Sequence, residues 1–357
     1  MKKLRVGILG ATGMVGQRYI DLLRDHPWFE VTYVVASERS AGKSYKAAVE
    51  WHMPGPIPKN VADLNVYAID KLDDAKKNCD FVFSALDSGI AKEYEEKYAE
   101  ADIPVISNSS CHRWTKDVPM LIPEINHEHI DIIPVQKKSR GWKKGFIAVK
   151  PNCSLQSYLL PLFALHEKFK IKKVMVTTMQ AVSGAGYPGV SSFSILDNII
   201  PYIGGEEEKT ELEPLKILGE IRGNEIVNYD GIKITAHCNR VPVIDGHLAC
   251  VSVEFEKKPT KEEILDIWKN FKSLPQELNL PFAPKQPIIY KDEINRPQTR
   301  LDRDLDKGMA VVVGRLRECS VLDYKFVGLS HNTIRGAAGG GILNAELLYK
   351  KGFLSDN

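Results

Sequence analysis

The stretch GATGMVG, residues 10–16, decides the fold of the first part of the chain. It follows the apolar run LRVGIL (4–9), which predicts a strand, and it opens a helix predicted over 14–25. A glycine turn between a strand and a helix is where a dinucleotide fold holds a pyrophosphate, because the unpaired N–H groups at the helix start face the ligand. The spacing is G-x-x-G-x-x-G rather than the more usual G-x-G-x-x-G, so it is the position of the turn that favours nucleotide binding.

The glycines of this turn have separate expected roles. Gly10 permits the tight turn, Gly13 lets a phosphate approach the backbone, and Gly16 allows the helix to pack closely on the strand. The alternative is a glycine-rich turn without a ligand. The residues of the turn that we predict to contact the cofactor are Gly10, Thr12, Gly13, Met14, Val15 and Gly16.

The end of the second predicted strand (31–36) indicates which dinucleotide binds. NAD enzymes tend to place an acidic residue there for the ribose 2′-hydroxyl. Here the strand is followed by Ser37, Glu38, Arg39 and Ser40. The serines and the arginine suit a 2′-phosphate and favour NADP, whereas Glu38 leaves NAD open as a weaker alternative. A polar loop without a ligand is the remaining alternative.

Outward from the turn, the first 150 residues alternate short apolar runs with amphipathic ones. This alternation predicts a parallel sheet with helices on both faces. The predicted strands are 4–9, 31–36, 65–69, 80–85, 104–107 and 146–149, and the predicted helices are 14–25 and 89–101.

After residue 171 the predicted strands become longer and richer in β-branched residues. Such strands, with fewer helices between them, predict a mostly antiparallel or mixed sheet in a second domain of α+β type. The predicted strands are 173–182, 231–238, 247–256, 308–318 and 323–330, with the clearest helix at 260–271 and a glycine-rich loop that leads into a terminal helix at 332–352.

Composition narrows the class of protein. The 357 residues include 48 basic and 46 acidic ones, a net charge of +2, which gives no electrostatic reason to expect nucleic acid or an anionic membrane as a partner. No run approaches the roughly 18 apolar residues of a membrane-spanning helix. The N-terminus does not read as a signal peptide, and six cysteines in such a chain predict reduced thiols in the cytoplasm.

One cysteine differs from the others by its place. Cys153 lies in KPNCSLQ (150–156), where a predicted strand leads into a predicted helix. We expect the helix N-terminus to lower the pKa of this thiol and to offer N–H groups to an oxyanion. With a nicotinamide domain, such a thiol predicts covalent oxidation or reduction at the aldehyde level, and a structural thiol is the alternative. A buried, inert thiol is the default for Cys79, Cys250 and Cys319.

Two adjacent pairs make a metal site conceivable, namely Cys111 with His112 and His237 with Cys238. Adjacent ligands point in different directions, however, and no CxxC or HxxxH spacing supports either pair. We therefore predict no metal site.

The catalytic base is sought among the histidines. His247 begins the predicted strand HLACVSVEF, directly after a glycine. It shares a face with Ala249, Val251 and Val253, so a core histidine is the alternative. Its place at a strand end favours an accessible ring, and His331 is the second choice.

Seven segments occur in this order along the chain: GATGMVGQR, SERSAGK, SNSS, PNCS, MQAVSGAGYPG, CNRVPVIDGH and HNTIRGAAGGG. Together they resemble one known family, the aspartate-semialdehyde dehydrogenases of the archaeal and fungal branch. The resemblance covers nearly the whole chain and implies a glyceraldehyde-phosphate-dehydrogenase-like α/β architecture. Residues 1–150 with 332–357 would form a Rossmann NADP-binding domain, and 151–331 an α+β catalytic and dimerisation domain, in a homo-oligomer that is a dimer or a tetramer.

The same resemblance implies roles for residues near the chemistry. Cys153 matches the nucleophile, His247 the acid/base histidine and Gln180 the residue that orients the intermediate. Further cofactor contacts are implied for Ser183, Gly184 and Asn332 on the nicotinamide side, with Ser84 and Asn108 lining the cleft.

Substrate contacts are also implied by the resemblance. Arg240 looks like the clamp for the α-carboxylate, since a planar guanidinium suits bidentate carboxylate binding. Arg113 with Asn152 resembles a phosphate-binding pair. Which of the three glutamates 206–208 contacts the substrate stays open. The implied substrate residues are Arg240, Arg113, Asn152, Glu206 and Lys209.

The implied reaction is the NADPH-dependent reduction of L-4-aspartyl phosphate to L-aspartate 4-semialdehyde through a cysteine thioester, a step towards lysine, threonine and methionine. A malonyl-CoA reductase of the same superfamily would use the same chemistry and is the nearest alternative. N-acetylglutamyl-phosphate reductase is less favoured, because its nucleophile segment reads differently from PNCS. A non-catalytic NADP-sensing protein is the alternative from another class, and it would not need Cys153, His247 and Arg240 together.

Overall fold

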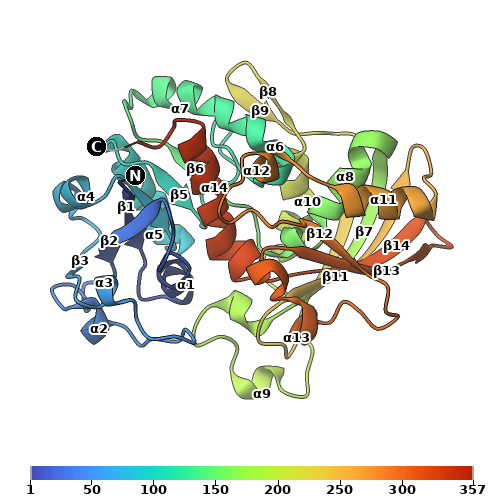
Figure 1. Ribbon diagram of the computed structural model, residues 1–357, viewed down its shortest axis with the longest axis horizontal. Helices are drawn as coiled ribbons and strands as arrows, with labels where there is room; N and C mark the ends of the chain where they lie inside the picture. Colours follow the sequence, from blue (N-terminus) through green and yellow to red (C-terminus); the bar gives the residue numbers. More distant parts are fainter. Residues whose placement is uncertain (1, 356–357) are drawn as a thin grey trace.

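The computed structural model describes residues 2–355, which form two six-stranded sheets with a helix between them. Figure 1 shows the first sheet at one end of the molecule and the second sheet at the other, with the C-terminal helix α14 (Gly339–Lys350) between them. The chain crosses from the first sheet to the second after Val149 and returns after Ser330. The exact domain boundaries at 150/151 and 331/332 stay a prediction.

The first sheet is parallel throughout and has the strand order β3-β2-β1-β4-β5-β6. This is the order of a doubly wound dinucleotide fold, in which the ligand crevice opens where the order reverses, beside β1 and β4. The predicted Rossmann-like sheet is therefore confirmed. The strands are β1 Leu4–Leu9, β2 Phe29–Val35, β3 Val66–Tyr67, β4 Phe81–Ser84, β5 Val105–Ser107 and β6 Ile147–Val149.

Helices cover both faces of this sheet, as the alternating sequence pattern predicts. Side chains of α4 and α5 pack on one face, and those of α1 and α14 on the other. Because both faces are covered, β4 and β5 are buried at every position, as is typical of parallel sheets. The helices of this part of the chain are α1 Met14–Leu22, α2 Tyr45–Ala48, α3 Lys59–Ala62, α4 Leu72–Asn78, α5 Ser88–Glu100, α6 Pro123–Asn126 and α7 Ile133–Arg140.

The second sheet is mixed, which confirms the predicted second domain. Its order is β10-β7-β11-β14-β13-β12; the two edge strands run parallel to their neighbours, and the inner pairs are antiparallel. The short strand β12 and the hairpin β8–β9 are not predicted from the sequence pattern. The strands are β7 Ile171–Gln180, β8 Glu220–Arg222, β9 Glu225–Val227, β10 Lys233–Arg240, β11 His247–Phe255, β12 Ile288–Lys291, β13 Val311–Glu318 and β14 Tyr324–Ser330.

One face of the second sheet packs on helices, and the other carries exposed side chains. Leu162 and Phe169 of α8 and Trp268 of α11 join the core against β7, β11 and β14. On the opposite face Met175 and Cys250 are exposed. Among the described residues no helix is long and apolar enough to cross a membrane. The helices here are α8 Leu159–Phe169, α9 Ser192–Ile195, α10 Glu206–Ile217, α11 Lys261–Asn270, α12 Leu274–Glu277 and α13 Thr299–Asp302.

The glycine turn has the geometry that its sequence predicts. Gly10 has φ +80°, a left-handed conformation that favours glycine. A Cβ at Gly16 would lie 2.2 Å from the carbonyl oxygen of Gly10, so helix α1 sits on the turn with no room for a side chain. A Cβ at Gly13 would meet the same oxygen at 3.5 Å, an ordinary contact.

These distances predict different effects for two alanine substitutions in the turn. Gly16→Ala should lower the free energy of unfolding by about 1–3 kcal/mol, because α1 must shift to relieve the overlap. Gly13→Ala should change it far less. Urea unfolding followed by circular dichroism measures both, and equal stability of the two variants would contradict the packing role of Gly16.

Candidate active site

The register of the second sheet brings three predicted site residues to one edge. Gln180 ends β7 and Arg240 ends the neighbouring parallel strand β10, and the two are register partners. His247 begins β11, which runs antiparallel to β7, so it starts at the edge where β7 ends. All three side chains are buried.

Cys153 reaches this edge from the chain segment that joins the two sheets. Its Sγ lies 3.2 Å from Nε2 of His247. The backbone N–H of Ala181 donates to Nδ1 of the same ring at 3.0 Å. In the neutral ring the proton therefore sits on Nε2 and points at the sulfur. His247 is thus arranged as a donor towards the thiol and towards any oxygen bound beside it.

The expectation that a helix start lowers the pKa of Cys153 is wrong for this unliganded state. Cys153 caps only a short 3₁₀ turn, Ser154–Ser157, and α8 begins after Tyr158 leaves the helical conformation at φ −141°. Burial raises the pKa of Cys153 to about 11, and the negative charge of Glu206 raises it further. Burial also lowers the pKa of His247 to about 3. The resting pair is therefore an uncharged thiol and a neutral imidazole.

Positive side chains around the thiol lower the pKa of Cys153 and so oppose the effect of burial. Lys150, Arg113 and Arg240 each favour the thiolate. Lys150 is itself buried, and burial lowers its pKa to about 7, while the nearby Cys153 raises it. Its Nζ donates to the carbonyl oxygen of Pro151 at 2.6 Å. The sequence pattern gives no signal for this lysine beyond its place three residues before the cysteine.

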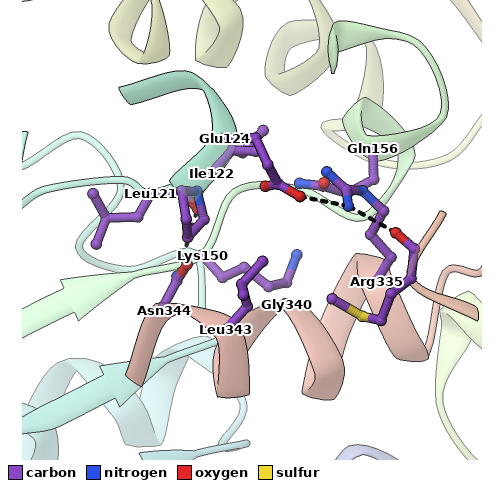
Figure 2. A pocket seen from close by; sticks show the side chains of 11 residues that line it. Leu121, Ile122, Glu124, Lys150, Gln156, Arg335, Gly340, Leu343 and Asn344 are labelled. Atoms are coloured by element: carbon purple, nitrogen blue, oxygen red, sulfur yellow. Dashed lines mark hydrogen bonds and ion pairs between the residues drawn. The ribbon is translucent and has the colours of Figure 1, made fainter. Parts of the chain in front are cut away.

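Lys150 lines both the catalytic pocket and a small cavity beside it. Figure 2 shows the residues that line this cavity. The cavity measures about 10 Å³, close to the space that one water occupies. Arg335 donates to Glu124 across it at 2.9 Å, and Asn344 on α14 contributes a buried carbonyl oxygen without a hydrogen-bond partner among residues 2–355.

The catalytic pocket has a volume of about 420 Å³ and gathers nearly all predicted catalytic and substrate residues. His247 does not line it directly but contacts Cys153 from behind. The predicted residues along the wall are Cys153, Gln180, Arg240, Arg113, Asn152, Glu206 and Lys209, together with Asn108 and Gly184.

Of the three consecutive glutamates at the start of α10, one faces this pocket. Glu206 is buried and lines the pocket. Glu207 accepts a hydrogen bond from the backbone N–H of Cys238 at 3.2 Å, and Glu208 is exposed. The geometry therefore favours Glu206 among the alternatives that the sequence leaves open.

The Glu206 carboxylate is held by three donors. Asn152 Nδ2 donates to it at 2.9 Å, Lys209 Nζ at 3.0 Å and Gln180 Nε2 at 3.1 Å. A buried carboxylate with this many donors has a fixed position. The network joins three residues from different elements around the thiol.

A second glutamate on α10 holds the two residues that are predicted to bind phosphate, Arg113 and Asn152. Glu213 is fully buried; it accepts from Arg113 Nη1 at 2.8 Å and from the backbone N–H of Asn152 at 2.6 Å. Arg113 Nη2 donates to the carbonyl oxygen of Asn108 at 3.0 Å. Glu213 was not expected from the sequence, because a glutamate in a charged helix reads as a solvated residue.

Arg240 is positioned by the loop after β7. Its Nη1 donates to the carbonyl oxygen of Ala181 at 2.7 Å. A Cβ at Gly184 would lie 2.8 Å from that Nη1 and 3.2 Å from Cε1 of His247. Gly184 thus lets the loop approach both side chains.

A larger cleft of about 1140 Å³ runs from the glycine turn along the carboxyl ends of the first sheet. It shares Val15, Leu86 and Asp87 with the catalytic pocket, so the two form one continuous space. This cleft fits the phosphates of a dinucleotide. It contains the glycine turn with Gly10 in the left-handed conformation and the start of α1, and Arg39 and Lys43 line it near the end of β2. The predicted cofactor residues along its wall are Gly10, Thr12, Gly13, Met14, Val15, Ser37, Arg39 and Ser40, joined by Lys43.

Four predicted cofactor residues do not line either space. Gly16 lies in the first turn of α1 and packs against Gly10 and Ala11, and Ser84 is buried at the end of β4. Asn332 donates to Ser183 Oγ at 2.8 Å and accepts from the N–H of Gly246 at 2.8 Å. Ser183 and Asn332 thus brace the turn directly before His247, and a contact with the cofactor stays a prediction for both.

The raised pKa of Cys153 predicts how the thiol reacts with iodoacetamide. The rate should keep rising with pH through pH 9, since the thiolate is the reactive form. Glu206→Gln removes the negative charge that raises the pKa, so it should speed alkylation at pH 8 by roughly threefold or more. Glu208→Gln, on the exposed side of the same helix, is the control. Mass spectrometry of the Cys153 peptide measures the rate, and identical profiles for all three proteins would contradict the electrostatic coupling.

The chain is similar to known semialdehyde dehydrogenases over both of its sheets. A family model described as semialdehyde dehydrogenase, NAD binding domain, matches residues 5–133, and one described as semialdehyde dehydrogenase, dimerisation domain, matches residues 162–335. The aspartate-semialdehyde dehydrogenase of Archaeoglobus fulgidus is 48% identical over 97% of this chain and 98% of its own length. A malonyl CoA reductase (NADP) from Metallosphaera sedula is 43% identical over 99% of both.

A solved structure is similar over the whole chain as well. The crystal structure of aspartate semialdehyde dehydrogenase with NADP from Candida albicans superposes with a TM-score of 0.90 at 46% identity, covering 98% of this chain and 99% of that one. Sequence, fold and two matching domain models agree over nearly the full length. The chain therefore belongs to the aspartate-semialdehyde dehydrogenase family, in its archaeal and fungal branch.

Proposed function

We propose that the chain reduces L-4-aspartyl phosphate to L-aspartate 4-semialdehyde, with NADPH as the reductant and a thioester on Cys153 as the intermediate. The observation that carries the proposal is the 3.2 Å contact between Cys153 Sγ and His247 Nε2, in a pocket that opens into the dinucleotide cleft. The product would feed lysine, threonine and methionine biosynthesis.

In the first step Cys153 attacks the acyl carbon as the thiolate. A carbon–sulfur bond forms and the bond from that carbon to the phosphate oxygen breaks, while the thiol proton leaves with the phosphate. Arg113, Asn152 and Lys209 line the pocket where a departing phosphate would lie. Binding of that dianion adds charge beside Arg113, whose partner Glu213 keeps it in place.

His247 and Gln180 act on the oxygen of the acyl group. The Nε2–H of His247 points into the region beside Sγ, where it donates to the carbonyl oxygen as negative charge develops. Gln180 lies in the same wall and is held by Glu206. When bound, NADPH supplies the hydride that reduces the thioester carbon. The resulting thiohemiacetal then releases the aldehyde and returns the thiolate, which takes up a proton from solvent.

The charged groups of the substrate would bind to side chains of opposite charge. Arg240, buried at the strand end, would bind the α-carboxylate, and Glu206 would bind the α-ammonium group. A malonyl thioester has a carboxylate but no amine. A buried carboxylate at position 206 therefore favours an amino-acid substrate over malonyl-CoA.

The cofactor preference follows from the end of β2. Ser37, Arg39, Ser40 and Lys43 line the cleft there, and their donors suit a 2′-phosphate. The relative from Candida albicans was solved with NADP. Glu38 also lines the cleft, and NAD remains the weaker alternative.

A homo-oligomer would cover apolar side chains that the single chain leaves exposed. Around α9 these include Phe193, Leu196, Ile199 and Tyr202, of which Phe193 is fully exposed. They lie in the part of the chain that matches a dimerisation domain model. A second copy of the chain is the partner that we propose for them.

The cytoplasm is the compartment that we propose for this reaction. All six cysteines are free thiols in the structure, as in a reducing compartment.

Removal of the nucleophile separates chemistry from cofactor binding. Cys153→Ala should abolish turnover of aspartate semialdehyde with NADP and phosphate, while the Kd for NADP stays within about twofold, because the thiol lies outside the phosphate-binding turn. Cys319→Ala, at a thiol far from the pocket, is the control. Turnover in Cys153→Ala would contradict the covalent mechanism. Absence of turnover in the native protein, with NADP still bound, would favour the sensor alternative.

Substitution of Arg240 should weaken substrate binding selectively and leave cofactor binding nearly unchanged. Arg240→Lys removes the planar fork and one charge-assisted hydrogen bond, a loss of roughly 1.5–3 kcal/mol. The KM for aspartate semialdehyde should therefore rise about tenfold or more, with the KM for NADP little changed. Arg222→Lys, at an exposed position, serves as the matched control. An equal rise in both KM values would contradict the clamp.

A substrate panel separates the two candidate reactions. The native protein should form NADPH from NADP with aspartate semialdehyde and phosphate, and it should oxidise NADPH slowly or not at all with malonyl-CoA. The reverse pattern would assign the chain to the malonyl-CoA reductases.

A further inference from the structure

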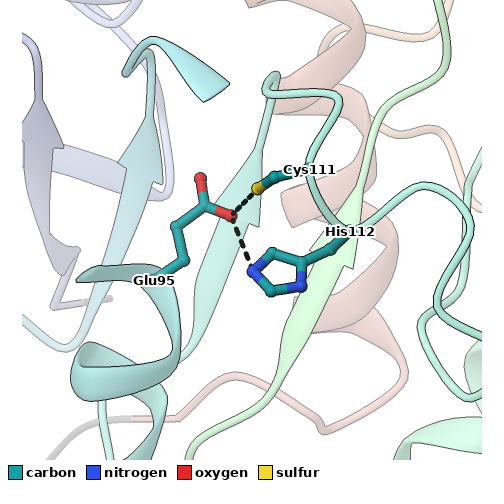
Figure 3. A group of neighbouring side chains, drawn as sticks. All are labelled: Glu95, Cys111 and His112. Atoms are coloured by element: carbon teal, nitrogen blue, oxygen red, sulfur yellow. Dashed lines mark hydrogen bonds and ion pairs between the residues drawn. The ribbon is translucent and has the colours of Figure 1, made fainter. Parts of the chain in front are cut away.

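Three side chains with metal-ligating atoms converge away from the catalytic pocket (Figure 3). Glu95 comes from α5, and Cys111 and His112 from the loop after β5. One ligand atom from each lies within 4.8 Å of the other two. Glu95 and His112 are buried, and Cys111 is partly exposed, which gives an ion a path from solvent.

The polar atoms of this cluster are incompletely paired. Glu95 Oε1 accepts from the hydroxyl of Ser107 at 2.6 Å. Oε2 faces Cys111 Sγ at 3.6 Å and His112 Nε2 at 3.8 Å. The second distance is too long for a hydrogen bond, and His112 Nε2 is buried without a hydrogen-bond partner among residues 2–355. A buried nitrogen in this state has lost its hydrogen bonds to water without replacing them, which is unfavourable. A ligand between the three groups would remove that cost.

We propose that Glu95, Cys111 and His112 bind one Zn²⁺ ion, with water as the fourth ligand. In a tetrahedral zinc site, Zn–N near 2.0 Å and Zn–S near 2.3 Å place ligand atoms about 3.4–3.6 Å apart. The separations of 3.6 and 3.8 Å to Glu95 Oε2 are already close to this spacing. The main change needed is in the separation between Cys111 and His112, which has to contract by about 1.3 Å at most.

Charge and ligand type both favour zinc over other common cations. A thiolate and a carboxylate carry two negative charges, so a bound divalent ion leaves this buried site neutral. The imidazole and the thiolate are softer ligands than Mg²⁺ or Ca²⁺ prefer, and both suit Zn²⁺. The sequence makes Cys111 and His112 a conceivable metal pair but predicts no site, because no third ligand lies near them in the chain; α5 supplies Glu95 only in the folded protein.

The site would restrain the loop that carries a substrate residue. His112 directly precedes Arg113, whose guanidinium bonds Glu213 and the carbonyl oxygen of Asn108. A zinc ion would tie this loop to α5. It would therefore stabilise the phosphate side of the pocket without touching the reacting atoms, and the proposal does not depend on which acyl substrate the enzyme takes.

Cobalt(II) titration in a variant without the catalytic thiol tests the proposal. Cys153→Ser removes the catalytic thiol, which also lies beside an imidazole, that of His247. In this background Co²⁺ should bind one per chain, with a thiolate-to-metal charge-transfer band in the near ultraviolet and tetrahedral bands in the visible. Added Zn²⁺ should displace it.

Three further substitutions in the Cys153→Ser background assign the ligands. Cys111→Ser should remove the charge-transfer band, and His112→Gln should weaken Co²⁺ binding by at least about tenfold. Cys319→Ser is the control and should leave both unchanged. Zn²⁺ should also raise the unfolding midpoint of Cys153→Ser but not that of the variant that lacks Cys111 as well. Absence of the band in Cys153→Ser, or its persistence without Cys111, would overturn the proposal.

Discussion

The contact between Cys153 and His247 depends on how two strands of the mixed sheet are paired. Because β11 runs antiparallel to β7, the residue that begins β11 lies beside the residue that ends β7. The parallel pairing of β10 with β7 adds Arg240 to the same edge. A register slip of one residue would turn His247 to the opposite face of the sheet and away from the sulfur. His247, Arg240 and Gln180 are therefore positioned by main-chain hydrogen bonds rather than by a flexible loop.

Helix α10 completes the site by bringing two buried carboxylates to the positive side chains. Glu206 holds Asn152, Gln180 and Lys209, and Glu213 holds Arg113. Buried charges of this kind are stable only when paired. In the unliganded protein Glu206 also favours the protonated thiol, since burial and the charge of Glu206 both raise the pKa of Cys153. A substrate whose ammonium group neutralises Glu206 would lower that pKa, so substrate binding itself would activate the nucleophile.

Local pattern accounts for much of the fold. The glycine turn at 10–16 and the alternation of apolar runs predict the first sheet, and the β-branched strands after residue 171 predict the second. The strand β12 escapes prediction because it has only four residues and its neighbours are polar and proline-rich. The start of α8 is also misplaced, because Tyr158 leaves the helical conformation within a continuous apolar pattern.

Some residues of the candidate site can be recognised from the sequence and others cannot. Cys153 and His247 stand at element ends, where a functional side chain can be recognised from its neighbours in sequence. Glu213 cannot be recognised in this way, because a charged residue in a charged helix looks solvated until tertiary packing buries it. Lys150 cannot either, because a lysine directly after a strand is usually exposed. The cluster around Glu95 is hidden for a related reason: helix α5 brings this residue to Cys111 and His112 only in the folded chain.

The most direct test of the account is a rapid-mixing experiment with aspartyl phosphate and no NADPH. A covalent mechanism predicts a burst of phosphate equal to one per active chain, with an aspartyl group bound to the peptide that contains Cys153. Addition of NADPH should then release aspartate semialdehyde and regenerate the free thiol. If phosphate appears only after NADPH is added, and the Cys153 peptide never gains mass, the thioester is not an intermediate and the account is wrong.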